Sequence, residues 1–316
     1  LLNIILIINN INMHSTKYIL SLFLSTFSFT KCLMNYSLIK TIQPKILRNY
    51  LKEKMERNYK YIPYTRAKEI LHKELNQIDI YGDNKENMNV EHIFPQYMFK
   101  NHELKKIMKS DMHHLYLCNT KLNTCRQNFK YVGHNHVLNS VKEEENTGIV
   151  LDMKGNKVTD PRDVFRNQGC LMMVNRKNKQ FIPSRYSRGK IARSLAYFAV
   201  KYNYLDELKE VIDIRDLIEW NIEDPVSNDE YLKNILTYKY QNNLNPFILK
   251  PELGLYCFTD CLDLSEDEFN EIYSKKRYST IDPLHSIKYF IKDNEELEKE
   301  NKRLKRILNK VKNIEL

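Results

Sequence analysis

The apolar residues of this chain recur mostly at helical spacing, and only two short stretches alternate as β-strands do. The strand candidates are Met88–Phe94, which Pro95 ends, and Met112–Leu117. The expected helices are Pro44–Gln77 with a break at Pro63 and a second start at Thr65, a helix from Lys121 capped by Thr120, Arg188–Tyr202 with one apolar side, Asp206–Trp220, and residues 228–242. A hairpin that turns at Gly155 is expected within Gly148–Asp160. The pattern predicts an α+β fold that is mainly helical.

Composition excludes several fold classes and favours a polyanionic partner. The 316 residues are 42% hydrophobic with only 7 Gly, which argues against disorder, collagen and glycine-dense β-repeats. Lys and Arg total 50 against 40 Asp and Glu, a net charge of +10. This charge favours nucleic acid or an anionic membrane without distinguishing them. No run of 18 apolar residues follows the N-terminal region, so we expect no membrane association for the body.

The first 30 residues resemble a targeting segment. The first methionine is Met13, Lys17 follows it, and Tyr18–Phe29 is an uncharged, mostly apolar run. This order is typical of a secretory signal peptide, which would make the protein secreted or lumenal if Met13 is the start. The alternatives are an untranslated or membrane-anchor segment in residues 1–30, or a buried helix, with the body cytoplasmic or nuclear.

The C-terminal quarter differs in composition from the rest. Residues 252–289 carry an acidic and then a basic cluster and are expected to be a linker or extension. Residues 290–314 form a heptad helix with Phe290, Asn294, Leu297, Asn301, Leu304, Leu308 and Val311 at alternating spacings of four and three. This spacing is typical of a coiled coil and predicts a homodimer through residues 290–311. The alternative is a single amphipathic helix that folds back on the body.

Residues able to cut a phosphodiester are concentrated in two stretches, 89–96 and 111–128. Carboxylate and amide oxygens, as in Glu91 and Asn123, suit Mg²⁺, Ca²⁺ or Mn²⁺. A neutral imidazole such as His92 can take a proton from water near pH 7. The guanidinium of Arg126 matches phosphate in geometry. Together these groups suffice for metal-assisted phosphodiester cleavage.

The same residues also have other interpretations. Each could be structural: Glu91 and His92 on the surface, Asn123 as a helix C-cap, and His113 and His114 in a core. A zinc site is a rival use of His113, Cys118, Cys125, His134 and His136, although their spacing fits no common zinc finger.

These two stretches resemble the bacterial endonuclease I family, secreted or periplasmic nucleases with a ββα-metal fold of the His-Me finger superfamily. The residues that match its two main motifs are Glu91, His92, Pro95, Gln96, Asp111, His113, Leu115, Asn123, Arg126 and Asn128. Later matching blocks are Phe181-x-Pro183, Arg188–Arg193, Leu217–Trp220, Asp224–Ser227 and Gln241–Ile248. The resemblance runs over residues 46–251 and implies a nuclease domain in residues 40–251 around a ββα-metal motif.

The resemblance also implies residue roles. His92 would be the general base, and Glu91 and Asn123 would hold one divalent ion, Mg²⁺ or else Ca²⁺ or Mn²⁺. Arg126 would steady either the phosphate or the helix that carries Asn123. Asp111 and His113 would brace the strand pair from outside the site. The residues implied in nucleic-acid binding are Lys121, Asn128, Arg188, Lys190 and Arg193.

The implied activity is hydrolysis of DNA, and also RNA, with little sequence preference and 5′-phosphate products. Three positions depart from the family pattern: Val90 replaces an Arg, Leu117-Cys118 replaces Pro-Ala, and His114 replaces an Asn. None of these removes the base or an implied metal ligand. The alternative function is a weakly active or inactive nucleic-acid-binding or scaffold protein of the same fold that dimerises through its C-terminal helix.

Overall fold

The computed structural model describes residues 43–75, 79–82, 87–133, 148–159, 171–262 and 265–274. All of them lie in one compact unit, Gln43–Ile281. The expected targeting segment in residues 1–30 and the heptad helix in residues 290–314 lie outside the described residues. Over the described ranges, no helix is both long enough and apolar enough to cross a bilayer.

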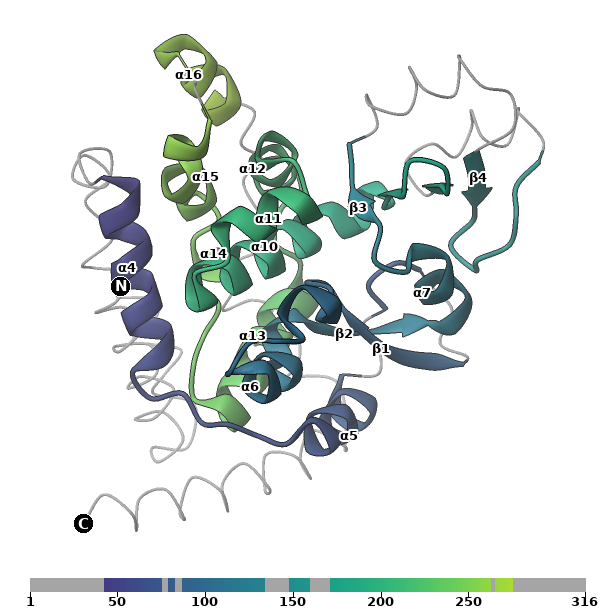
Figure 1. The fold of residues 1–316 in the computed structure, drawn as a ribbon, viewed down its shortest axis with the longest axis horizontal. Helices are drawn as coiled ribbons and strands as arrows, with labels where there is room; N and C mark the ends of the chain where they lie inside the picture. The colour runs from purple at the N-terminus through teal and green to yellow at the C-terminus, as the bar shows by residue number, and fades with distance from the viewer. Residues whose placement is uncertain are drawn as a thin grey trace, which may run out of the picture. The chain divides into compact units, whose positions relative to one another are not determined.

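Two antiparallel strands followed by a short helix form the part of the fold that carries the predicted chemistry (Figure 1). Strand β1 (Met88–His92) pairs with β2 (Leu115–Asn119), and helix α7 (Thr120–Arg126) packs on both strands. The cap of α7 is Asn119, whose side chain accepts from the Lys121 N–H at 2.9 Å, and not Thr120 as predicted.

The body of the unit is helical, and α10 (Arg185–Tyr202) lies in its interior. Figure 1 shows α11 and α12 beside it, and α10 also packs against α4 and α14. The sequence predicted a helix with one apolar side, but α10 is buried on most sides. The other helices are α4 (Pro44–Glu56), α5 (Tyr64–Glu74), α6 (Lys105–Ser110), α11 (Leu205–Val211), α12 (Ile214–Glu223), α13 (Asn228–Gln241), α14 (Pro246–Leu249), α15 (Leu253–Phe258) and α16 (Glu266–Ser274). The 3₁₀ helices are η1 (Gln96–Phe99), η2 (Met112–His114) and η3 (Thr259–Cys261).

A second sheet has the strand order β3-β6-β5-β4. Its strands are β3 (Lys130–Tyr131), β4 (Gly148–Leu151), β5 (Met172–Asn175) and β6 (Gln180–Ile182). The expected turn after β4 is present: Gly155 has φ +77°, and Leu151 bridges Lys157. The main partner of β4 is β5, however, and not the chain after the turn.

Several element boundaries differ from the predictions for local reasons. Strand β2 begins at Leu115 and not at Met112, because the Asp111 side chain caps the preceding 3₁₀ turn. The single helix predicted over Asp206–Trp220 is two helices, with a new start where Asp213 accepts from the Arg215 N–H. Helix α5 begins at Tyr64, directly after Pro63, and not after a Thr65 cap.

The chain after Glu252, where a linker or extension was expected, packs against the body through α15. Helix α15 packs against α4 and α12, and Cys257 and Phe258 are completely buried. Arg48 of α4 donates to both carboxylate oxygens of Asp260, at 2.6 and 2.7 Å. The nuclease-like body therefore includes the described residues that follow the 40–251 boundary.

Candidate active site

His92, the last residue of β1, is held as one tautomer of neutral imidazole. Its Nε2 lies 3.0 Å from the carbonyl oxygen of Lys109, which can only accept, so Nε2 carries the hydrogen. Its Nδ1 therefore has a lone pair, and the Gln96 amide nitrogen donates to it at 3.1 Å. Burial lowers the pKa of His92 well below its usual value, and the charge of His114 acts in the same direction. His92 is consequently an unprotonated acceptor at neutral pH.

Glu91 is buried against positively charged and hydroxyl donors. Its Oε1 lies 3.1 Å from the Arg126 guanidinium and accepts from the Tyr81 hydroxyl at 2.9 Å. Burial raises the pKa of Glu91, whereas Arg126 and Tyr81 oppose that rise. Both of these contacts are made by Oε1, and the backbone N–H of His92 also acts on the carboxylate to lower its pKa.

Helix α7 faces one side of β1. Asn123 and Arg126 are three residues apart on α7 and therefore share a face. The Asn123 amide nitrogen donates to Asn89 Oδ1 at 2.7 Å, while Arg126 pairs with Glu91, two residues further along the strand. Because the nitrogen is the donor end of the amide, Oδ1 is the acceptor that Asn123 can offer to a further ligand.

Glu91 and His92 have different neighbours, as expected for successive residues of a regular strand. Glu91 contacts Tyr81 and Arg126, whereas His92 contacts Lys109 and Gln96. The strand ends at His92, two residues before the predicted end at Phe94.

Arg126 is part of the framework of the site. Its side chain is almost completely buried, and it donates to the backbone carbonyls of Ile93 and Gln127 in addition to pairing with Glu91. Its guanidinium also lies over the Tyr131 ring, 4.6 Å from the centroid. The resemblance implies that Arg126 steadies either the phosphate or the helix that carries Asn123. These contacts favour the second role, in which Arg126 steadies α7 and Glu91.

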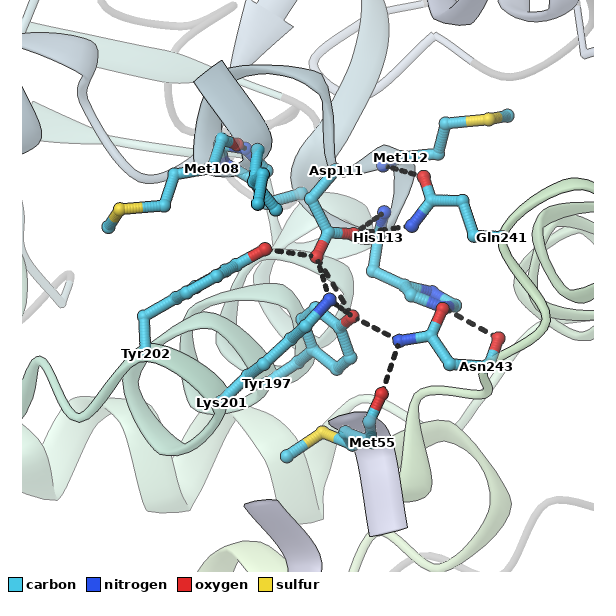
Figure 2. Close-up of polar contacts among 12 residues, drawn as sticks. Met55, Met108, Asp111, Met112, His113, Tyr197, Lys201, Tyr202, Gln241 and Asn243 are labelled. Carbon is cyan, nitrogen blue, oxygen red and sulfur yellow. Dashed lines mark hydrogen bonds and ion pairs between the residues drawn. The ribbon is translucent and has the colours of Figure 1, made fainter. Parts of the chain in front are cut away.

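Asp111 is the centre of a buried hydrogen-bond network behind the strand pair (Figure 2). Its Oδ2 accepts from Lys201 at 2.6 Å, Tyr202 at 2.8 Å and Tyr197 at 2.9 Å, all on α10. Its Oδ1 accepts from the His113 N–H at 3.1 Å and the Gln241 amide at 3.0 Å. Despite burial, these donors hold the pKa of Asp111 well below its usual range. The network ties the turn before β2 to α10 and to the end of α13.

His113 extends this network, with its Nε2 3.0 Å from the Asn243 carbonyl, and His114 is bound in the same way, 2.7 Å from the Met108 carbonyl. Burial lowers the pKa of His113 to about 3 and that of His114 to about 4. Both imidazoles are therefore neutral parts of the support beneath β2, and the bracing role that the resemblance implies for His113 stays a prediction.

Acid should destabilise the fold through these two histidines. An unfolded histidine takes up its proton near pH 6.5, whereas the folded pKa values are about 3 and about 4. The contribution of the two histidines to the free energy of unfolding has its full value above about pH 6.5. It is lost as pH falls toward 4, because only the unfolded state gains protons in that window. We expect the free energy of unfolding to drop by several kcal/mol between pH 7 and pH 4.5. Urea unfolding measures this, and His113→Gln should flatten the pH dependence, whereas His72→Gln, at an exposed position, should not.

The basic and amide residues implied in nucleic-acid binding divide into two groups. Lys121 and Asn128 are exposed at the two ends of α7. Arg188 and Lys190 are half-buried in the first turns of α10, and the charge of Lys190 acts on Asp79, which accepts a backbone hydrogen bond from Asn119.

Arg193 is a correction. Its side chain is completely buried and forms a two-point pair with Glu230, with Nε–Oε1 at 2.8 Å and Nη2–Oε2 at 2.7 Å. A third bond runs from Nη1 to the Asp224 carbonyl at 2.8 Å. Arg193 therefore joins α10 to α13 and cannot reach a nucleic acid.

Sequence reasoning missed two tyrosines and one lysine at the site. Tyr81 and Tyr131 are buried, their hydroxyls bond each other, and Tyr81 also bonds Glu91. Lys109 supplies the carbonyl that determines the His92 tautomer. No local pattern marks them, since all three act through contacts between separate segments. The rival zinc site has no support in the described part of the chain, where no three His, Cys, Asp or Glu side chains gather closely enough to hold an ion; His134 and His136 lie outside it.

Comparison with known proteins gives a family for the chain. The family model of Endonuclease I matches residues 50–252, which is more than half of the chain. An extracellular ribonuclease of Bacillus subtilis (strain 168) is 37% identical over 81 residues, covering 21% of this chain and 28% of that protein. An extracellular ribonuclease of Bacillus amyloliquefaciens is 35% identical with the same coverage. The chain thus matches less than a third of the length of these relatives. Its match to the family model, which spans β1, β2, α7 and most of the helical body, shows that the chain belongs to the endonuclease I family.

Proposed function

We propose that this protein is a divalent-metal-dependent endonuclease that hydrolyses the phosphodiester bonds of DNA and RNA with little sequence preference. The observation that carries the proposal is the state of His92: a neutral imidazole with a defined acceptor nitrogen, one residue from a carboxylate held by Arg126. Membership in the endonuclease I family and the similarity to two extracellular ribonucleases support it.

His92 acts as the general base in this mechanism. Its Nδ1 accepts a proton from the attacking water, and the Lys109 carbonyl keeps the proton on Nε2 from leaving. The water oxygen bonds to phosphorus and the bond from phosphorus to the 3′ oxygen breaks. The leaving 3′ oxygen takes a proton from a solvent water, which leaves a 5′-phosphate and a 3′-hydroxyl. Gln96, exposed and bonded to Nδ1, must give up that bond as water and substrate enter.

Glu91 and Asn123 are the residues that would hold the metal ion, and their donor chemistry fits Mg²⁺, with Ca²⁺ or Mn²⁺ as alternatives. Glu91 Oε2 and Asn123 Oδ1 are hard oxygen donors. The other polar atom of each side chain, Glu91 Oε1 and the Asn123 amide nitrogen, already contacts the protein. Few protein ligands are typical of Mg²⁺, which keeps several waters. The bound ion would stabilise the negative charge that develops on the leaving 3′ oxygen. The β1–β2–α7 unit is then the proposed ββα-metal motif.

Arg126, Tyr81 and the cationic residues complete the proposal. Arg126 and Tyr81 orient Glu91 through their bonds to Oε1. Lys121, Asn128, Arg188 and Lys190 would contact the nucleic-acid backbone, which predicts strong salt dependence and weak sequence discrimination. Secretion, with a signal peptide from Met13, is part of the proposal and is supported by the extracellular relatives.

The chemistry of the cut ends tests this function. Hydrolysis with water as nucleophile should leave RNA fragments with 3′-hydroxyl and 5′-phosphate ends, detectable by mass spectrometry. Fragments that end in a 2′,3′-cyclic phosphate would contradict the proposal, because they arise by attack of the ribose 2′-hydroxyl. DNA lacks that hydroxyl and serves as the matched substrate.

Tyr81→Phe should weaken metal use without unfolding the protein. The change removes one hydrogen bond to the Glu91 carboxylate, worth about 1.5–3 kcal/mol. We expect the Mg²⁺ concentration for half-maximal activity to rise about tenfold, in the range given for loss of a second-shell partner. The matched control is Tyr116→Phe, which removes another buried hydroxyl, bonded to Ser194 and not to Glu91. Equal metal dependence in the two variants would refute a positioning role for Tyr81.

A further inference from the structure

An aromatic ring lies next to the proposed base and has no part in the mechanism. Tyr64, the first residue of α5, is half-buried with its ring centroid 5.4 Å from that of His92, and the two planes are inclined by 36°. This separation is one of direct ring contact. A substrate that reaches His92 must therefore pass close to Tyr64.

Two lysines surround the same ring. The Lys109 ammonium lies 4.8 Å from the Tyr64 ring centroid and the Lys68 ammonium 5.8 Å from it. Within the described ranges, neither ammonium is paired with a carboxylate, and the nearby Glu69 instead binds Arg66 at 2.8 Å. The charge of Lys109 also reaches His92, whose pKa it helps to lower. The surroundings of the ring are thus positively charged and directly beside the base.

The Tyr64 ring and the two ammonium groups match the base and the phosphate of a nucleotide, respectively. An aromatic side chain offers a face on which any base can stack, and ammonium groups attract the phosphates on either side of it. The two ammonium groups lie over the ring, so a base that stacks on it displaces them from the face, and they remain close enough to meet a phosphate beside that base. The carbonyl of Lys109 orients His92, which links the position of this cluster to that of the base.

We infer that Tyr64, Lys68 and Lys109 form a subsite for one nucleotide of a single-stranded nucleic acid, adjacent to the phosphate that is cut. The inference rests on the proposed function for the position of the cut. Stacking on Tyr64 requires a base that is not already stacked in a duplex, so the ring favours single strands. The two lysines contact phosphates and therefore serve single and double strands alike.

Binding measured without cleavage tests the subsite. Fluorescence anisotropy with a labelled DNA octanucleotide and a hairpin duplex, both in EDTA, gives the dissociation constants of the whole protein and its variants. Tyr64→Ala should weaken octanucleotide binding about tenfold, the usual effect of losing a base–aromatic stack, and duplex binding less than about twofold. Tyr64→Phe should bind as the wild type does. Tyr238→Ala, a half-buried tyrosine on α13, is the control.

Further variants separate stacking from packing and charge. Tyr64→Leu keeps an apolar side chain against His92 and should lose single-strand binding as Tyr64→Ala does. Lys68→Ala and Lys109→Ala should weaken both ligands and reduce the salt dependence of binding, whereas Lys73→Ala, exposed on the same helix, should not. Equal effects of Tyr64→Ala on single strand and duplex, or wild-type octanucleotide binding by Tyr64→Leu, would overturn the subsite. Neither result depends on catalysis, so failure of the nuclease proposal would be seen separately, as an absence of cleavage.

Discussion

Replacing His92 with alanine is expected to lower the single-turnover rate of nucleic-acid cleavage by about 10²–10⁴-fold, the usual contribution of a positioned general base. In the variant, no side chain occupies the position of the imidazole Nδ1 to take the proton from water. The two groups that hold the imidazole cannot replace it. The Lys109 carbonyl is too weak a base to take a proton from water, and the Gln96 amide nitrogen is a donor. The measurement is the cleavage rate of plasmid and of RNA with protein in excess over substrate.

The control for this variant is His72→Ala, an exposed histidine on α5. It should cleave at the wild-type rate. Nucleic-acid affinity and the unfolding curve of His92→Ala should also stay close to wild type, since the imidazole makes few bonds to the rest of the protein. Full activity of His92→Ala would end its assignment as the base, and a lost fold would be visible in the unfolding curve.

Asp111→Ala is expected to destabilise the fold by about 3–5 kcal/mol, the cost of leaving a buried charge without its partner. The Lys201 ammonium would keep its burial and lose the carboxylate 2.6 Å away, and the hydroxyls of Tyr197 and Tyr202 would lose the same acceptor (Figure 2). Urea unfolding at pH 7.5 measures the change. Asp206→Ala, which removes an exposed carboxylate paired with Lys209, should cost less than about 1 kcal/mol.

A double variant shows whether the buried charge is the cause. Asp111→Asn with Lys201→Met removes both charges and retains similar volumes, so it should be more stable than Asp111→Asn alone. If the double variant were less stable by the sum of the two single losses, Asp111 and Lys201 would act independently. That outcome would contradict the ion pair as the main support of the turn before β2.

Local patterns in the sequence predicted much of the fold. Alternation identified β1 and β2, and helical spacing identified α4, α10 and α13, because each pattern follows from the geometry of its own segment. The boundaries were less accurate where a side chain caps a turn, as Asp111 and Asp213 do. Helix α6 was not predicted, since six residues are too short to display a period.

The candidate site residues that lie within the two sequence motifs were named from the sequence, and those contributed by distant segments were not. Glu91, His92, Asn123 and Arg126 come from two stretches, and β1 and α7 bring them together. Arg193 was misassigned because its partner, Glu230, is on another helix and nothing near Arg193 in the sequence indicates it. Tyr64 and Tyr81 were missed for the same reason, since each acquires its neighbour only when distant segments pack. Motif and residue type therefore identified the candidate residues, whereas burial decided which of the predicted cations remain accessible.

The most direct test of metal-dependent hydrolysis is a single-turnover assay of the full chain on plasmid DNA and on RNA, with Mg²⁺ and then with excess EDTA. Both substrates should be cleaved with Mg²⁺, cleavage should stop in EDTA and return when Mg²⁺ is restored, and His92→Ala should be deficient under all conditions. Undiminished cleavage in EDTA would contradict metal dependence, and binding of both substrates without cleavage under any of Mg²⁺, Mn²⁺ and Ca²⁺ would contradict nuclease activity.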